Sequence, residues 1–378
     1  MSLHKEQTLA CLKLSLCEGV GNGAIHALVE HFGSAADALT APTEELRAVP
    51  GVGLEVAEAI RRGPSEGDVE RELELMERHR VRLVPSFSEE YPEPLIHLDS
   101  SAPALLRVKG DYLPEDGLAM AMVGSRRCSE YGRAQARRMA ADLASMGLTI
   151  VSGLARGIDS AAHRGALRAR GRTLAVLGQG LAHPLPPRRM ELAEEIVSSG
   201  ALLSELPMET PPRAANFPPR NRIISGLSLG VVVLEAASRS GSLITARHAG
   251  EQGRSVFAVP GNVDSPTSRG CHKLIRDGAV LVERARDVVE GLGPLSRPVE
   301  LPTPEQADAP ARLVEDPRVL ALNQREQQIY DLVGTSAVHI DEIVARTELA
   351  LSIVSSILLT LEIRGLIRQV SGQRYVRG

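Results

Sequence analysis

Residues 148–178 read LTIVSGLARGIDSAAHRGALRARGRTLAVLG, and this stretch decides the fold class. Short apolar runs stand at both of its ends, and residues 158–170 between them have the character of a helix. A strand, a helix and a second strand in this order form a crossover unit that places two strands parallel in one sheet.

The same alternation extends on both sides of this unit. Further strands are expected at LAMAMVG (118–124), ALLSEL (201–206), GVVVLE (230–235), SVFAVP (255–260) and AVLVE (279–283). Helices are expected between most of them, at 130–146, 190–199 and 243–252. The pattern predicts an α/β fold whose parallel sheet is covered by helices on both faces.

Residues 1–65 are expected to form a separate helical domain that contains a repeated turn. GVGNGAI (19–25) recurs as GVGLEVA (51–57), and an apolar helical pattern follows each copy. Such a turn leaves backbone N–H groups at a helix start, where they can bind a phosphate oxygen. The repeat resembles a helix-hairpin-helix (SAM-like) pair, and a plain helical bundle with glycine turns is the alternative. A charged helix over 66–82 follows, and its charges are expected to form a solvated surface.

The C-terminal part reads as a linker and a small domain. Residues 291–317 are rich in proline and lack periodicity, which indicates a linker between a 66–290 domain and a 318–378 domain. Helices are expected at 324–333, from His339 with Asp341 as its cap, and at 349–363, followed by a hairpin around Ser371 and Gly372, which together describe a winged helix. The third helix lacks Lys and Arg, so contact with a protein is favoured over recognition of DNA bases by this helix. Four arginines near the hairpin are candidate contacts to phosphates or to a protein: Arg364, Arg368, Arg374 and Arg377.

Composition and missing motifs exclude several classes of protein. The 378 residues carry a net charge of −4, so any nucleic-acid binding must rest on a local basic patch. No P-loop, dinucleotide fingerprint, HExxH or CxxC pattern occurs, so no catalytic, cofactor or metal site is expected. Asp159 and His163 are expected to be a helix-start carboxylate and its neighbour one turn later, not a catalytic pair. No apolar run is long enough for a membrane helix, and a cytoplasmic location is expected.

The turns that follow the strands carry the candidate binding residues. Ligands of parallel α/β sheets collect at the carboxyl ends of the strands. Glycine and serine let backbone N–H groups approach an anion there, and arginine binds phosphate through two hydrogen bonds. The residues of these turns are Gly124, Ser125, Arg126, Ser152, Gly153, Arg156, Gly157, Ser240, Gly241 and Ser242. They predict a site for a phosphorylated ligand.

The segment RAANFPPRNRIISGLS (213–228) narrows the kind of ligand. It contains Phe217 beside Arg220, Asn221 and Arg222, and it has no acidic residue. The other phenylalanines stand in sequence contexts suited to burial: Phe32, Phe87 and Phe257. An exposed ring among guanidinium groups suits an unpaired base and its phosphates. In the alternative interpretation, Phe217 fills the space under the loop and the arginines begin an amphipathic helix.

At these residues the chain resembles the DNA-processing protein A (DprA/Smf) family. The matching motifs are VGSR (123–126), SGLARGIDSAAH (152–163), FPPRNRIISGLS (217–228), EAASRSGSLITAR (235–247), VFAVPG (256–261) and LIRDGA (274–279). They lie in a core of residues 120–282. Residues 179–189 and His272 depart from the family pattern.

The resemblance implies an extended Rossmann-like domain that dimerises and binds single-stranded DNA in a basic pocket. It also implies a role in natural transformation (competence) and homologous recombination, in which the protein protects incoming DNA and loads the RecA recombinase. The competing possibility is an enzyme of the LOG, or lysine-decarboxylase-like, group, which cleaves nucleoside monophosphates. That group carries a catalytic glutamate in a loop that here reads SGSLITA (240–246) and contains none. We therefore expect a binding protein and not an enzyme.

Overall fold

The computed structural model of the chain describes residues 3–293, 322–334, 338–347, 349–370 and 374–377. The linker expected at 291–317 lies almost wholly outside these residues. The chain divides into two compact units, one of residues 1–144 and 148–285 and the other of residues 145–147 and 286–378. Within the described residues, no helix combines the length and the apolar character that crossing a bilayer requires.

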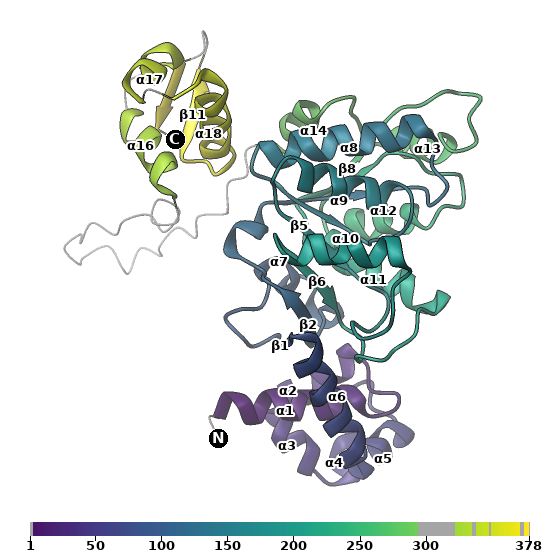
Figure 1. Ribbon diagram of the computed structural model, residues 1–378. Coiled ribbons are helices and arrows are strands. Elements are labelled where there is room, and N and C mark those ends of the chain that lie inside the picture. Colours follow the sequence, from purple (N-terminus) through teal and green to yellow (C-terminus); the bar gives the residue numbers. More distant parts are fainter. Residues whose placement is uncertain (1–2, 294–321, 335–337, 348, 371–373, 378) are drawn as a thin grey trace, which may run out of the picture. The chain divides into compact units, whose positions relative to one another are not determined.

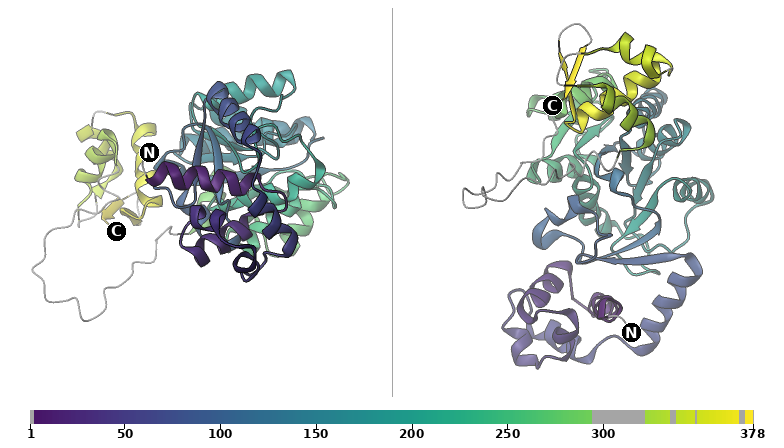
Figure 2. Two further views of the ribbon diagram at one scale, coloured as in Figure 1. Left: turned by 90° about the horizontal axis from the view of Figure 1, so that it is seen from below. Right: turned by 90° about the vertical axis from the view of Figure 1, so that its left-hand side faces the viewer.

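The first unit begins with five helices that share their own core (Figure 2). Leu14, Leu28, Leu46 and Ile60 are completely or almost completely buried in it. The helices are α1 (Leu3–Leu16), α2 (Asn22–Phe32), α3 (Ala35–Thr40), α4 (Thr43–Arg47) and α5 (Leu54–Arg62). Both copies of the repeated turn start a helix as expected, because α2 and α5 begin directly after Gly21 and Gly53.

Helix α6 (Glu66–His79) connects these helices to the sheet. Its apolar side chains Leu75 and Met76 are buried against Met208. The expectation that all of its charges are solvated is wrong for Glu72, whose side chain is 5% exposed. Glu72 accepts a hydrogen bond of 2.6 Å from Nε of Arg107, a fully buried residue of the sheet. Periodicity in the sequence cannot reveal such a charge, because its partner is distant along the chain.

A sheet forms the centre of the first unit (Figure 1). It has nine strands, in the order β1-β2-β6-β5-β4-β3-β7-β8-β9. All seven strands expected from the sequence are present. They are β3 (Ala119–Val123), β4 (Thr149–Ser152), β5 (Thr173–Val176), β6 (Ala201–Ser204), β7 (Gly230–Val233), β8 (Ser255–Ala258) and β9 (Val280–Leu281). These seven strands pair in parallel throughout.

The sheet as a whole is mixed, which corrects the expectation of a purely parallel sheet. Strands β1 (Val81–Pro85) and β2 (Leu105–Gly110) extend one edge, and both β1–β2 and β2–β6 are antiparallel. The run of β2 is interrupted by Arg107 and Lys109, so it lacks the continuous apolar character of the other strands. The buried ion pair with Glu72 makes Arg107 compatible with a strand interior.

Helices cover both faces of the sheet. On one face, Leu174 and Val176 of β5 share a cluster with side chains of α11 (Phe217–Gly226) and α12 (Ser242–Glu251). On the other face, Ala175 packs with α10 (Pro187–Val197), and α9 (Ile158–Arg168) lies against α8 (Glu130–Ser145). Helices α7 (Glu93–Ile96) and α13 (Arg269–Arg276) and the short 3₁₀ turns η1 (Asp99–Ser101), η2 (Pro114–Gly117) and η3 (Ala214–Asn216) complete the unit, and α14 (Ala285–Leu292) begins at its end.

The second unit contains the winged helix. Its helices are α16 (Gln324–Leu332), α17 (Ile340–Thr347) and α18 (Leu351–Ile363), and its three-stranded sheet has the order β10 (Val338–His339), β12 (Arg374–Arg377), β11 (Ile367–Val370). The tip of the hairpin at Ser371 and Gly372 lies outside the described residues. Asp341 is not the cap of α17, because that helix begins at Ile340 and places Asp341 in its first turn. The ring nitrogen Nδ1 of His339 accepts from the N–H of Asp341 instead (3.3 Å).

Two of the four arginines near the hairpin have structural partners. Arg364 forms an ion pair of 3.3 Å with Glu326, and Arg377 lies over the ring of Tyr330, 4.5 Å from its centre. Arg368 and Arg374 are exposed on the two strands of the hairpin. Arg377 is exposed as well, so three of the four arginines remain accessible to phosphates or to a protein.

Candidate nucleic-acid interface

A groove of about 640 Å³ lies at the carboxyl ends of β3 and β7, between the turns that follow them and α11. Nine of the predicted site residues line it: Gly124, Ser125, Arg126, Phe217, Arg220, Asn221, Ser240, Gly241 and Ser242. We call this hollow the arginine groove. Turns that are far apart in the sequence thus meet at one edge of the sheet, as the parallel topology predicts.

The turn after β3 is held by backbone contacts that leave no room for larger side chains nearby. The N–H of Ser125 donates to the carbonyl oxygen of Glu235 (2.6 Å), and the carbonyl oxygen of Ser125 accepts from the N–H of Ile158 (3.2 Å). Gly157 has φ of +87°, and a Cβ added there would overlap the carbonyl oxygen of Ser125. Glycine is required at this position for both reasons, so Gly157 shapes the groove without lining it.

Phe217 is the first residue of α11, and its ring is half-buried. The guanidinium of Arg126 lies over the ring, 4.7 Å from its centre, a distance typical of a cation–π contact. Gly178 lies against the ring edge, where an added Cβ would come within 3.1 Å of Cδ1. The ring is therefore held between the two turns, and a base that stacks here must share it with, or displace, the exposed side chain of Arg126.

The expectation that Phe87 is suited to burial is wrong, because its side chain is 45% exposed in the turn after β1. Phe257 is completely buried in β8, as expected. Exposure alone therefore does not distinguish Phe217. Its position in the groove, next to Arg126, does.

Arg220 is buried at the floor of the groove and is not an open phosphate ligand. Its NH1 donates to the carbonyl oxygens of Gly153 (3.0 Å) and Val176, and its Nε has no hydrogen-bond partner among the described residues. Burial lowers the pKa of Arg220 to about 10, and the carboxylate of Asp159 opposes that shift. The guanidinium thus stays charged at neutral pH and supplies positive potential from beneath.

Several predicted residues lie outside the lining of the groove. The hydroxyl of Ser152 is buried and donates to the carbonyl oxygen of Met122 (2.6 Å), while Gly153 accepts from Arg220. Arg156 is exposed on the turn after β4, beside the groove. Arg222 does not line the groove either, because its guanidinium is bound to the carboxylate of Glu205 (2.7 Å) and is only 13% exposed.

Three further arginines that sequence reasoning did not select belong to this region. Arg127 and Arg239 line the groove and are exposed. Arg189, on the first turn of α10, lies in the loop that departs from the family pattern. Burial, and then the nearby guanidinium groups of Arg126 and Arg156, lower the pKa of Arg189. Arg127 and Arg239 share a signal in the sequence, a position on a turn that follows a strand, directly beside another arginine or a serine. Arg189 lacks that signal, because it stands within α10.

The charge of the groove is strongly one-sided. Asp159 is the one carboxylate among the described residues that line it, and it is buried. Burial raises the pKa of Asp159, while Arg220 and the backbone N–H groups that it accepts from lower it. The arginines at the rim therefore have no exposed carboxylate between them, and they favour a ligand with several negative charges.

His163 is a structural residue. It is fully buried, and its Nδ1 lies 2.7 Å from the hydroxyl of Thr173. Burial, with a smaller effect of Arg220, lowers its pKa to about 3. The ring is thus neutral in the folded protein, and nothing in this geometry makes it a general base for a ligand in the groove.

We expect His163 to make the protein less stable in mild acid. Its unfolded pKa is about 6.5, so between pH 6.5 and 3 the unfolded chain binds a proton that the folded chain does not. Stability from this residue is complete above pH 6.5, and about 2 kcal/mol is lost by pH 5. Urea titrations at pH 7 and pH 5 should show this loss, and it should shrink in His163→Gln but not in the exposed control His97→Gln. An equal loss in His163→Gln would contradict the assignment.

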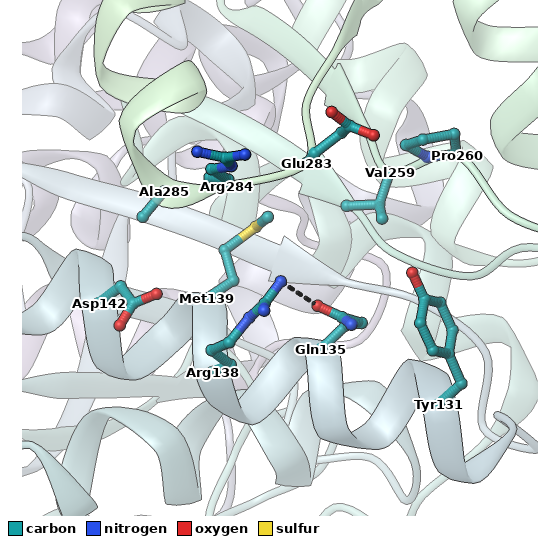
Figure 3. Close-up of a pocket in the computed structure, with 10 residues that line it drawn as sticks. All are labelled: Tyr131, Gln135, Arg138, Met139, Asp142, Val259, Pro260, Glu283, Arg284 and Ala285. Carbon is teal, nitrogen blue, oxygen red and sulfur yellow. Dashed lines mark hydrogen bonds between the residues drawn. The ribbon is translucent and has the colours of Figure 1, made fainter.

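A second hollow, of about 440 Å³, lies between α8 and the segments at 259–260 and 283–285 (Figure 3). Its lining has both charge signs, because Arg138 and Arg284 are accompanied by Asp142 and Glu283, and Arg138 donates to Gln135 (2.7 Å). A polyanion is favoured much less here than in the arginine groove. Across the residues that the structure describes, no cluster of three His, Cys, Asp or Glu side chains could hold a metal ion.

Comparison with known proteins agrees with this architecture. Residues 82–293 match the family model for the DNA recombination-mediator protein A, and residues 302–373 match the model for the DprA winged helix domain. Protein Smf of Escherichia coli is 41% identical over 310 residues, which cover 82% of this chain and 80% of that protein. Protein Smf of Synechocystis is 34% identical and covers 97% of this chain and 98% of its own length.

A solved structure shows the same fold. The X-ray structure of DNA processing protein A from Streptococcus pneumoniae superposes with a TM-score of 0.63 at 35% identity, and covers 74% of this chain and 95% of that one. The matches include the sheet with its glycine turns, the segment with Phe217 and the winged helix. The chain therefore belongs to the DNA-processing protein A (DprA/Smf) family.

Proposed function

We propose that the protein binds single-stranded DNA in the arginine groove and carries out no chemistry on it. The observation that carries this proposal is the pairing of the Phe217 ring with the exposed guanidinium of Arg126, at the centre of a groove whose other exposed charges are arginines. An aromatic ring and guanidinium groups are what stacking on a base and holding its phosphates require. A solved relative of 28% identity and TM-score 0.51, from Helicobacter pylori, is described as DNA processing protein A with a unique single-stranded DNA binding mode.

The proposed site consists of the groove residues and the arginines beside them. In this proposal Arg126, Arg127 and Arg239, which line the groove, hold phosphates, and Phe217 stacks on a base. Ser125 and Ser240 supply polar groups at the rim, whereas Asn221 and Ser242 are buried and the Asn221 amide donates to the carbonyl oxygen of Gly241 (3.3 Å). Arg156 and Arg189 extend the positive potential toward the turn after β5. Gly153, Gly157 and Arg220 shape the floor.

We further propose that the protein acts in the cytoplasm as a recombination mediator that delivers bound single strands to the RecA recombinase. In natural transformation and homologous recombination, the bound protein protects the incoming single strand until delivery. Support comes from the family model that matches residues 82–293. We also propose a homodimer through the Rossmann-like domain, since β9, which among the described residues pairs with β8 alone, is an edge strand and exposes Val280 and Leu281.

A binding assay at two salt concentrations tests the proposal. The full-length protein should bind a labelled 30-nucleotide single strand more tightly than the matching duplex, and added salt should weaken binding steeply, because phosphate contacts release counterions. Equal affinity for the two substrates, or no binding of either, would contradict the proposal.

Arg126→Ala should reduce the salt dependence of single-strand binding. The slope of log K against log salt should become shallower by about 0.7 for each phosphate contact that is lost. Arg168→Ala is the matched control, because this exposed arginine lies in the last turn of α9, which leads away from the carboxyl edge of the sheet. Fluorescence anisotropy between 50 and about 300 mM salt measures both slopes. Equal slopes in Arg126→Ala and the control would remove Arg126 from the site.

A further inference from the structure

The segment Glu205–Met208, which follows β6 and leads toward Phe217, is held by side chains from distant parts of the chain. The backbone N–H of Met208 donates to both carboxylate oxygens of Glu72 (2.9 and 3.1 Å) on α6. The carbonyl oxygen of Glu205 accepts from Arg107 of β2 (3.2 Å). Helix α6 and strand β2 therefore each supply a side chain that fixes this segment.

The third contact comes from the N-terminal helices themselves. Asn22 is the first residue of α2 and belongs to the first copy of the repeated turn. Its Oδ1 accepts from the N–H of Ala104 (2.9 Å), and its Nδ2 donates to Oε2 of Glu205 (2.7 Å). The side chain thus faces the sheet, and one of its bonds ends on a carboxylate close to the groove.

Glu205 passes this contact on to α11. Its two carboxylate oxygens accept from NH1 and NH2 of Arg222 (3.1 and 2.7 Å), and both side chains are nearly buried. A bidentate pair of this kind fixes direction as well as distance. Because Arg222 is on the same ten-residue helix as Phe217 and Asn221, the pair constrains the orientation of the whole helix.

We propose that Asn22 is a positioning residue for the arginine groove, which acts through Glu205 and Arg222 to hold α11 so that the Phe217 ring lies beneath Arg126. The N-terminal helices thereby control how tightly the groove binds single strands, without touching the DNA. This inference rests on the proposed function of the groove. It also gives the repeated turn a role in which the first copy is a docking contact and not a phosphate site.

The substitution Asn22→Asp tests the proposal at one atom. Aspartate keeps the oxygen that accepts from Ala104, so the N-terminal helices keep that contact. It replaces the donor to Glu205 with a second carboxylate, which repels Glu205 and competes for Arg222. Gln7→Glu is the matched control, because it makes the same amide-to-carboxylate change on α1 and keeps the oxygen that accepts from Ala36.

Two measurements report the effect. Asn22→Asp should weaken binding of a labelled thymidine 30-mer by about 3- to 10-fold, in the lower part of the range for residues coupled through one network, while Gln7→Glu should not. The chain has no tryptophan, so Phe217→Trp provides a single fluorophore in the groove. In that background and without DNA, Asn22→Asp should shift the emission to longer wavelength and increase quenching by acrylamide.

A second substitution supplies the rescue. When Glu205→Gln is combined with Asn22→Asp, the new amide can donate to the introduced aspartate and its oxygen can still accept from Arg222, so affinity and emission should return toward those of the unaltered groove. If Asn22→Asp does not fold, Glu205→Gln alone, which weakens the pair with Arg222, should change the emission in the same direction. Unchanged affinity and emission in Asn22→Asp would overturn the positioning role of Asn22. If Asn22→Asp does not fold, unchanged affinity and emission in Glu205→Gln would overturn it.

One further variant separates this inference from the proposed function. If Phe217→Ala binds DNA as tightly as the unaltered protein, the function assigned to the groove fails. If Phe217→Ala loses affinity while Asn22→Asp behaves like Gln7→Glu, the groove stands and the positioning role of Asn22 is wrong.

Discussion

Replacing Glu72 with alanine is expected to lower the free energy of unfolding by about 3 to 5 kcal/mol, the cost of leaving a buried charge without its partner. Arg107 is completely buried, and its NH2 has no hydrogen-bond partner among the described residues even with Glu72 in place. Burial lowers the pKa of Arg107, and the Glu72 carboxylate opposes this shift. Without that carboxylate, the Met208 N–H also loses its acceptor. Urea unfolding followed by circular dichroism measures the change.

Two controls show whether the loss comes from the buried charge. Glu90→Ala removes one of the two exposed carboxylate partners of Arg82, and a surface pair of this kind contributes at most about 1 kcal/mol. The double replacement Glu72→Ala with Arg107→Met removes both charges and should be more stable than Glu72→Ala alone, because a buried pair replaced by apolar groups costs little. A double variant less stable than Glu72→Ala would show that the pair is not the source of the effect.

Phe217→Ala should weaken single-strand binding by about 1 to 3 kcal/mol, or roughly 5- to 150-fold, which is the range for one stacked base. Duplex binding should change less, because paired bases are not available for stacking on a side chain. The substitution also removes the ring over which the Arg126 guanidinium lies, 4.7 Å from the ring centre. Part of the lost affinity therefore comes from a guanidinium that is no longer held in place. Anisotropy titrations with single-stranded and duplex oligonucleotides measure both affinities.

The chain offers a matched control for this substitution. Phe87 is an exposed phenylalanine, whereas Phe217 is half-buried, and Phe87 follows β1 at the other end of the sheet order from β7 and β8. Phe87→Ala should leave single-strand affinity unchanged, and Phe217→Tyr, which keeps a ring, should retain most of it. An equal loss in Phe87→Ala would show that general instability, and not stacking, explains the result.

Much of the fold could be predicted because its signals are local. Each of the seven parallel strands is a short apolar run bounded by turn residues. Each strand can therefore be predicted from its own few residues, without knowledge of its neighbours in space. Helix α10 begins at Pro187, three residues before its expected start, because proline suits the first turn of a helix. Strands β1 and β2 could not be predicted in this way, since the buried Arg107 breaks the apolar run of β2.

The arrangement of the groove could be predicted in part for the same reason. Parallel topology brings the turns after β3 and β7 to one edge, so Ser125 and Ser240 meet at a place that the strand pattern indicates. The direction in which a side chain of α11 points is not encoded by such a pattern. Phe217 and Arg222 stand five residues apart in one basic segment, yet the first faces Arg126 and the second faces Glu205.

The sequence by itself determined the α/β class, the order of the parts, the turns that meet at the binding edge and the family to which the chain belongs. The class, the order of the parts and the meeting of the turns follow from periodicity and turn chemistry within a few residues, whereas the family follows from the resemblance of whole motifs. Only the tertiary structure decided which arginines are open to a ligand and which are engaged. Glu72 meets Arg107 across 35 residues, and Asn22 meets Glu205 across 183. A charge is available to a polyanion only when no carboxylate of the fold already binds it, and that depends on which distant segments folding brings together.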